Sequence, residues 1–103
     1  MFKLQAGYWV FENLIIQGVC RRHKYCQHAF YIVGAAEGTV IRNNHLRDFN
    51  AAIKGNGIVI AAKRRFPSRV LIEGNTFFNA APRKTARPVT PINAVGGSHW
   101  VIR

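Results

Sequence analysis

An internal repeat with a constant period is the feature that most constrains what this chain can fold into. Three nine-residue segments align without gaps: YWVFENLII (8–16), TVIRNNHLR (39–47) and VLIEGNTFF (70–78). In this alignment Asn13, Asn44 and Asn75 share one column, and the step between them is the same each time. Fixed periods of 20–50 residues are typical of solenoids and stacked arrays.

The aligned segments have the composition of β-strands. They are rich in Val, Ile and Phe, alternate with period two, and end at Gly or Asn. A second strand per repeat is predicted at 28–34, 57–62 and 89–95. The alignment predicts two buried columns: Val10, Ile41 and Ile72 before the asparagine, and Ile15, Leu46 and Phe77 after it.

About three short strands in each repeat predict an all-β fold, a right-handed single-stranded parallel β-helix of about three coils. Residues 1–103 then form one domain, with the start of a fourth coil at HWVIR (99–103). Coils stack at the strand spacing of ~4.8 Å, so an asparagine at the same bend of each coil can bond to its own copies. The predicted ladder is Asn13, Asn44 and Asn75. Three unrelated turn asparagines are the alternative interpretation.

The charge balance restricts the partners of the chain. Its 15 Lys and Arg residues against 4 Asp and Glu give a formal charge of +11, which favours polyanionic partners. No apolar run approaches the ~20 residues that a membrane span requires, so no membrane partner is expected. Near the start of the chain, Gln5 and Glu12 interrupt the apolar core that a signal peptide needs.

Two stretches, VIRNNHLRDFNAAIKGNG (40–57) and VLIEGNTFFNA (70–80), carry a resemblance to a known family. They resemble the coils of the pectate-lyase-like superfamily of right-handed parallel β-helix proteins. Within it they are most similar to alginate lyase, chondroitinase-type lyase and mannuronan epimerase relatives. The resemblance implies an acidic polysaccharide as partner and an exported protein. Because family members are longer, it also implies an internal section of a longer β-helix, and it leaves open whether that section is active by itself.

The resemblance further implies β-elimination or epimerisation next to a uronate carboxylate. That chemistry needs a base, a positive group for the carboxylate and a donor for the leaving oxygen. On the family's pattern Lys54 is the candidate base, and Arg42, Arg47 or Arg83 is the candidate carboxylate clamp. The alternative interpretation treats these residues as solvated positions of a basic solenoid.

Two basic, proline-containing segments, 62–69 and 81–91, are predicted to leave the coil as arms. Their candidate substrate-binding residues are Arg64, Arg65, Lys84 and Arg87. Such side chains bind phosphate as readily as carboxylate, so a nucleic acid is the rival partner. A purely structural fragment is the other alternative.

The run from Cys20 to Cys26 contains two cysteines, and His23 and His28 lie close by. The pattern leaves three possibilities open: a Cys20–Cys26 disulfide, which suits the exported habit of the family, free thiols, or a Zn²⁺ site. His28 is expected on the solvent side of its strand. The four carboxylates are spread over separate coils, so neither a Ca²⁺ site nor any other cofactor is predicted.

A stack of coils that is open at both ends exposes unpaired strand edges. Such edges pair with other chains unless they are covered. The segments at the two ends are 8–16 and 99–103, and the sequence therefore predicts end-to-end self-association.

Overall fold

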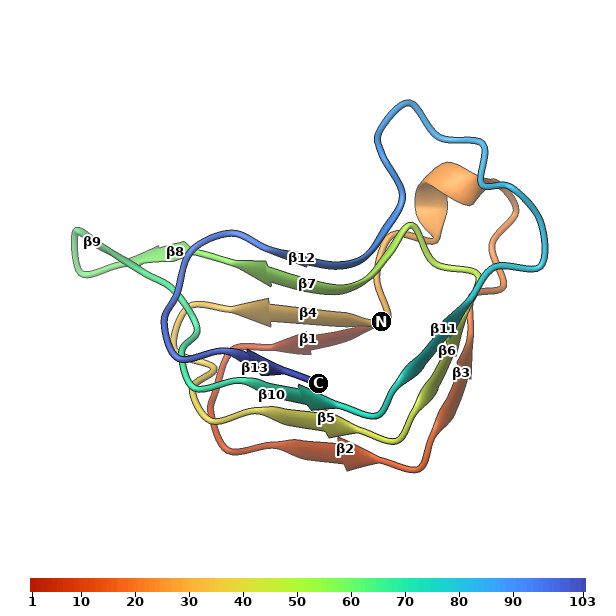
Figure 1. Ribbon diagram of the computed structural model, residues 1–103. Coiled ribbons are helices and arrows are strands. Elements are labelled where there is room, and N and C mark those ends of the chain that lie inside the picture. The colour runs from red at the N-terminus through yellow and green to blue at the C-terminus, as the bar shows by residue number, and fades with distance from the viewer.

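The computed structural model describes residues 1–103 and contains thirteen short strands and one 3₁₀ turn, η1 (His23–Tyr25) (Figure 1). The predicted all-β class is therefore confirmed. No helix in the structure has the length and apolar character needed to cross a membrane.

Eleven of the strands form three parallel sheets. Sheet A contains, in spatial order, β1 (Phe2–Leu4), β4 (Phe30–Val33), β7 (Ala51–Asn56) and β12 (Thr90–Ala94). Sheet B contains β2 (Val10–Glu12), β5 (Val40–Arg42), β10 (Leu71–Glu73) and β13 (Val101–Ile102). Sheet C contains β3 (Ile15–Gln17), β6 (His45–Arg47) and β11 (Thr76–Phe78). The remaining two, β8 (Ile58–Ile60) and β9 (Lys63–Arg65), form an antiparallel hairpin.

The chain visits the sheets in a constant order, A then B then C, and each strand pairs with the strand of the previous pass. Figure 1 shows the three sheets side by side around a common interior. The first pass leaves β1, β2 and β3 with one free edge, which we call the head edge. The last strands, β12, β13 and β11, form the tail edge.

The strand register differs by one residue from the predicted columns. In sheet B, Phe11 pairs with Ile41 and Ile41 with Ile72, and in sheet C the aligned residues are Ile16, Leu46 and Phe77. The first step along each column is therefore shorter by one residue than the second. The predicted burial of Val10 and Ile15 is wrong, because their exposed fractions are 52% and 77%.

The interior between the sheets is filled by large apolar side chains. Phe30 of β4 is fully buried, and its ring lies 5.0 Å from that of Phe11 and 5.5 Å from that of Phe2. Eleven buried residues form one continuous core. The largest of them are Phe30, Ile32, Ile41, Leu46, Ile53 and Ile72.

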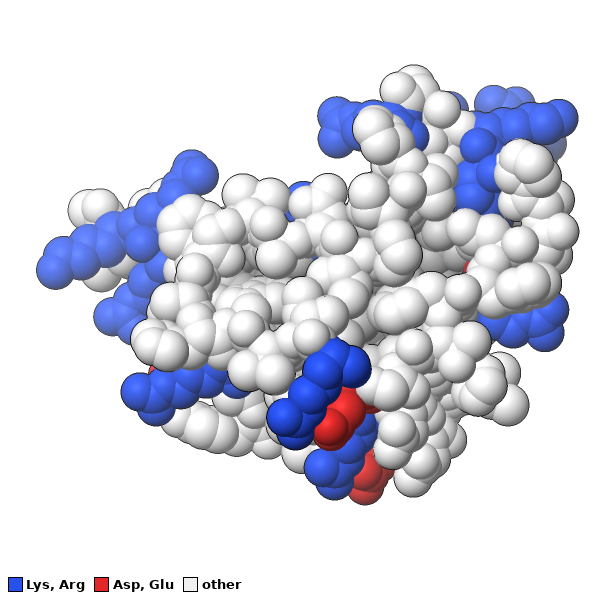
Figure 2. Space-filling view, viewed as in Figure 1, with Lys and Arg blue, Asp and Glu red and all other residues white.

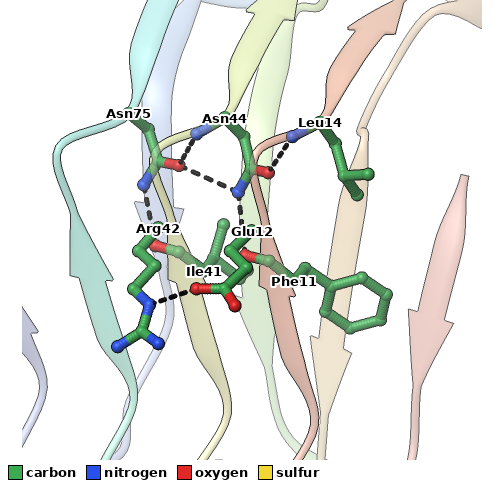
Figure 3. Close-up of polar contacts among 7 residues, drawn as sticks. All are labelled: Phe11, Glu12, Leu14, Ile41, Arg42, Asn44 and Asn75. Carbon is green, nitrogen blue, oxygen red and sulfur yellow. Dashed lines mark hydrogen bonds and ion pairs between the residues drawn. The ribbon is translucent and has the colours of Figure 1, made fainter.

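The asparagine ladder contains Asn44 and Asn75, but Leu14 takes the place predicted for Asn13 (Figure 3). The Asn44 side-chain amide donates to Asn75 Oδ1 and to the Phe11 carbonyl, both at 3.0 Å, and Asn44 Oδ1 accepts from the Leu14 N–H at 3.0 Å. Asn75 in turn donates to the Ile41 carbonyl at 2.8 Å. Every amide atom of the fully buried Asn44 is thus satisfied.

Asn13 belongs to the neighbouring column, where the backbone turns from sheet B to sheet C. Its partners there are Asn43 and Gly74, and all three have positive φ values, of 59°, 54° and 63°. Asparagine and glycine are the residues that most readily adopt this left-handed conformation. Asn13 therefore serves to form the bend, and the residue at the ladder position in the first pass is Leu14.

Sheet A does not follow the period of the repeat. Its aligned residues are Phe2, Phe30, Ile53 and Ile92, and the three steps between them are all of different length. The middle step is the shortest and the last is the longest. Excursions of different length between the sheets cause this variation. The predicted strand at 57–62 lies in one of them, the β8–β9 hairpin, and β7 takes its place in sheet A.

Candidate functional site

The largest pocket, of about 570 Å³, lies over the outer face of sheet A. Lys54 of β7 and Asn93 of β12 are neighbours across the sheet, and the Lys54 ammonium donates to Asn93 Oδ1 at 3.1 Å. Lys24 and Arg87 lie on the two loops that wall the pocket. Its other lining residues are Gln27, His28, Asn50, Ala51, Thr85, Ala86, Pro88 and Thr90.

Two basic arms stand at opposite ends of the sheet A strands. The β8–β9 hairpin follows the last residue of β7 and carries Arg64 and Arg65. The loop 79–89 precedes β12 and carries Lys84 and Arg87. Figure 2 shows blue side chains gathered at both places, with the tail edge of sheet A between them. Of the predicted substrate-binding residues, Arg87 lines the pocket over sheet A, whereas Arg65 lines a separate pocket beside Glu37.

All four carboxylates are engaged elsewhere. Glu12 pairs with Arg42 at 2.6 Å, Glu73 with Arg103 at 2.8 Å, and Glu37 with Arg69 at 3.5 Å. Asp48 accepts from the Ala80 N–H at 2.9 Å and from Gln17, and these bonds lower the pKa of the Asp48 carboxyl. The pocket over sheet A therefore has positive side chains and no carboxylate in its lining.

The predicted catalytic residues lie on different sheets. Lys54 lines the pocket, but Arg42 is on sheet B, paired with Glu12, and Arg47 is on sheet C, where its guanidinium lies 5.4 Å from the Phe78 ring centre. Neither arginine can therefore serve as a clamp beside Lys54. Arg83, which precedes the pocket-lining part of its loop, donates to Asn50 Oδ1 at 3.1 Å, and one of its guanidinium nitrogens is buried without a partner.

The wall formed by residues 18–28 is held by covalent and polar contacts. The structure joins Cys20 and Cys26 in a disulfide, so the two sulfur atoms are not available to Zn²⁺. Asn50 donates its side-chain amide to the His23 carbonyl at 2.7 Å, and the Lys84 N–H donates to His23 Nδ1 at 2.6 Å. The Lys84–His23 bond connects the two loops that wall the pocket, and Asn50 bridges them because it also accepts from Arg83. Each loop therefore helps to position the other.

His28 is half-buried in the pocket, whereas the sequence predicted an ordinary solvent-side residue. Its ring stacks on Tyr31 with centres 5.5 Å apart, and Nδ1 lies 2.7 Å from the Ala51 carbonyl. Because a carbonyl only accepts, Nδ1 carries the proton and Nε2 is the free basic atom of the neutral ring. Burial is the main cause that lowers the pKa of His28, and the positive charge of Lys54 acts in the same direction. His28 is therefore neutral at pH 7.

The stability of the fold should depend on pH through His28. Unfolded, this side chain titrates near its ordinary value of 6.5, whereas folded its pKa lies lower. Between the two values the unfolded chain binds a proton that the folded chain does not. We expect the free energy of unfolding to be highest above pH 6.5 and to fall as the pH is lowered from there to the folded pKa.

Urea unfolding at a series of pH values measures this dependence. The substitution His28→Asn, which keeps a donor for the Ala51 carbonyl, should flatten the profile in that window. His45→Asn, at an exposed position of β6, provides the control and should keep the wild-type slope. A His28→Asn profile identical to the wild type would contradict the assignment.

The sequence missed His28, Tyr31, Asn50 and Asn93 as site residues. Tyr31, Lys54 and Asn93 are neighbours across sheet A, but the first of their two separations is shorter than the period of the repeat and the second is longer. No signal in the repeat could therefore have aligned them. Basic composition alone pointed to the two arms.

Comparisons of the chain with protein-family models, with curated proteins and with solved structures found no match.

Proposed function

We propose that this chain forms a right-handed parallel β-helix that binds an acidic polysaccharide over the outer face of sheet A. Three parallel sheets visited in constant order, and an internal asparagine ladder, support the fold. The resemblance of residues 40–57 and 70–80 to pectate-lyase-like coils supports both the fold and the class of ligand.

One observation carries the functional proposal: Lys24, Lys54 and Arg87 line a pocket of about 570 Å³ that has no carboxylate in its lining. The volume lies in the range of small-ligand sites. Each uronate unit of an acidic polysaccharide carries one carboxylate, which a lysine or arginine binds through charge-assisted hydrogen bonds. The two basic arms extend the positive potential beyond the pocket, which suits a polymer.

The other polar residues favour a sugar over a nucleic acid. Gln27 and Asn93 line the pocket with exposed amide groups, which can donate to and accept from sugar hydroxyls. Single-stranded nucleic acids are held chiefly by stacking of bases on aromatic rings. No aromatic side chain except the His28 imidazole lines this pocket, and the Tyr31 ring beside it packs on His28.

The same face contains groups suited to β-elimination. In this step His28 Nε2 takes the proton next to the uronate carboxylate, a carbon–carbon double bond forms, and the bond to the leaving oxygen breaks. The Tyr31 hydroxyl accepts from Asn56 at 3.2 Å, so its proton is free for the leaving oxygen. Lys54, which already donates to Asn93, supplies the positive charge for the carboxylate. In this proposal His28 replaces Lys54 as the base.

Binding to uronate oligomers, measured by calorimetry at fixed salt, tests the proposal. Removal of a charge-assisted hydrogen bond by Lys54→Gln or Arg87→Gln should weaken binding about tenfold each. Arg103→Gln removes the same charge from sheet B and should change the affinity less than about twofold. Equal losses for all three variants would mean that only the net charge matters, and would contradict the site.

Two further measurements separate the alternatives. Ultraviolet absorbance of unsaturated uronates detects elimination, and His28→Gln should abolish any such signal while keeping binding. Tighter retention of single-stranded DNA than of uronate polymers at the same salt would favour the nucleic-acid alternative. Binding of neither polymer would favour a purely structural role.

A further inference from the structure

The outer face of sheet B carries charges that alternate in sign from strand to strand. The column runs Glu12, Arg42, Glu73 and Arg103, and the pairs Glu12–Arg42 and Glu73–Arg103 are joined at 2.6 Å and 2.8 Å. Figure 2 shows the alternating red and blue side chains on this face. The column begins with a negative charge at the head edge and ends with a positive charge at the tail edge.

The apolar side chains at the two edges are also matched. At the head edge, Phe2 and Phe11 begin two interior columns, and Ile92 and Ile102 end the same columns at the tail edge. Ile102 retains an exposed fraction of 55% and Phe2 one of 43%. Each edge therefore leaves apolar surface in line with the core, beside unpaired backbone groups.

We propose that these edges join copies of this chain head to tail, with the tail edge of one copy against the head edge of the next. β13 then pairs with β2 of the second copy, and β12 with β1. In this register Arg103 stands beside Glu12 of the second copy and continues the alternation. Ile102 packs on Phe11 of the second copy, as Ile72 packs on Ile41 within one chain.

Head-to-head pairing lacks this complementarity. It would bring two copies of Glu12 to the same interface, whereas tail-to-tail pairing would bring together two copies of Arg103. Sheet C has three strands, and an apolar pocket of about 210 Å³ lies beside β11. The head-to-tail contact is therefore made by sheets A and B. Because it joins different surfaces of the two copies, it can continue into longer assemblies.

Disulfide trapping tests the orientation. Val10 and Val101 are both exposed on sheet B and would be direct neighbours across the proposed contact. Paired strands lie ~4.8 Å apart, which is within the Cα–Cα range of a disulfide. An equal mixture of Val10→Cys and Val101→Cys chains should form crosslinked dimers under mild oxidation, resolved by non-reducing electrophoresis and mass spectrometry.

The matched controls are each variant alone and a mixture of Val101→Cys with Arg64→Cys, on the β8–β9 hairpin. None of these should crosslink. Dimers formed by Val10→Cys alone would show head-to-head pairing and overturn the proposal. Crosslinking of the hairpin control to the same extent, or sedimentation of the wild type as a monomer at its highest soluble concentration, would also overturn it.

Charge reversal provides an independent readout. Glu12→Arg should weaken association about threefold in sedimentation equilibrium, and addition of Arg103→Glu in the same chain should recover most of the loss. Glu37→Arg, which reverses a charge in a turn away from both edges, should leave association unchanged. Equal weakening by Glu12→Arg and the double variant would contradict the proposed neighbours.

Discussion

Replacement of Asn44 by leucine should destabilise the fold by about 4 kcal/mol, because it leaves buried polar groups without partners. The side chain is fully buried, donates to the Phe11 carbonyl and to Asn75, and accepts from the Leu14 N–H. Leucine has a similar size but removes the side-chain hydrogen bonds of the Phe11 carbonyl and the Leu14 N–H, at a cost of about 1–3 kcal/mol each before relaxation. Asn75 Oδ1 still accepts from the backbone N–H of residue 44 at 3.0 Å. Urea unfolding followed by circular dichroism measures the change.

Asn13→Gly is the matched control for this prediction. The repeat assigned Asn13 the same role as Asn44, whereas the structure places it at a bend with φ of 59°. Glycine adopts that conformation easily, so the control should change the stability by less than about 0.5 kcal/mol. Equally large losses for Asn13→Gly and Asn44→Leu would favour the predicted ladder, and a small loss for Asn44→Leu would contradict the buried role of Asn44.

Phe30→Ala should destabilise the fold to a similar extent, by about 4 kcal/mol. Phe30 is fully buried at the centre of the core, between Phe2 and Phe11. Truncation to alanine loses the transfer free energy of the ring and leaves a cavity that the surrounding strands can close only in part. The free energy of unfolding in urea measures the loss.

Phe78→Ala makes the same substitution at an exposed site of β11. Its ring has an exposed fraction of 51% and contacts the Arg47 guanidinium, so the expected loss is below about 1 kcal/mol. If Phe30→Ala does not fold, Phe30→Leu should still unfold cooperatively with a loss of about 1–2 kcal/mol. Equal losses at positions 30 and 78 would contradict the assigned core.

The slip of one residue in the predicted columns has a local cause. The second repeat has asparagine at both Asn43 and Asn44, so Asn13 can be aligned with either of them. The sequence alignment favoured Asn44, because that choice makes the two steps of the repeat equal. Backbone pairing instead places Val10 beside Val40 and Asn13 beside Asn43. Because side chains alternate along a strand, this slip exchanged the buried and exposed residues of β2 and β3.

The placement of the site was decided by segments outside the repeat. Lys54 could be recognised as a candidate because it follows an apolar strand residue in the sequence. Its neighbours Tyr31 and Asn93 come from passes of unequal length, and His28 and Arg87 come from the two loops. The segments between strands differ in length from pass to pass. The sheets stay intact because each segment begins at the end of one strand and ends at the start of the next. Sequence spacing therefore carries no information about which of these side chains meet.

The amino-acid sequence by itself determined the strand-rich character of the chain, the second step of the repeat in sheets B and C, the amides at positions 44 and 75, and the two basic arms. These features follow from side-chain preferences and from similarity between nearby segments, which are local properties. Only the tertiary structure decided that Leu14 ends the ladder, that every carboxylate is engaged away from sheet A, and that His28 enters the pocket beside Lys54. The physical reason is that hydrogen-bond register between strands and the path of each loop fix these neighbours, and both depend on residues far apart in the chain.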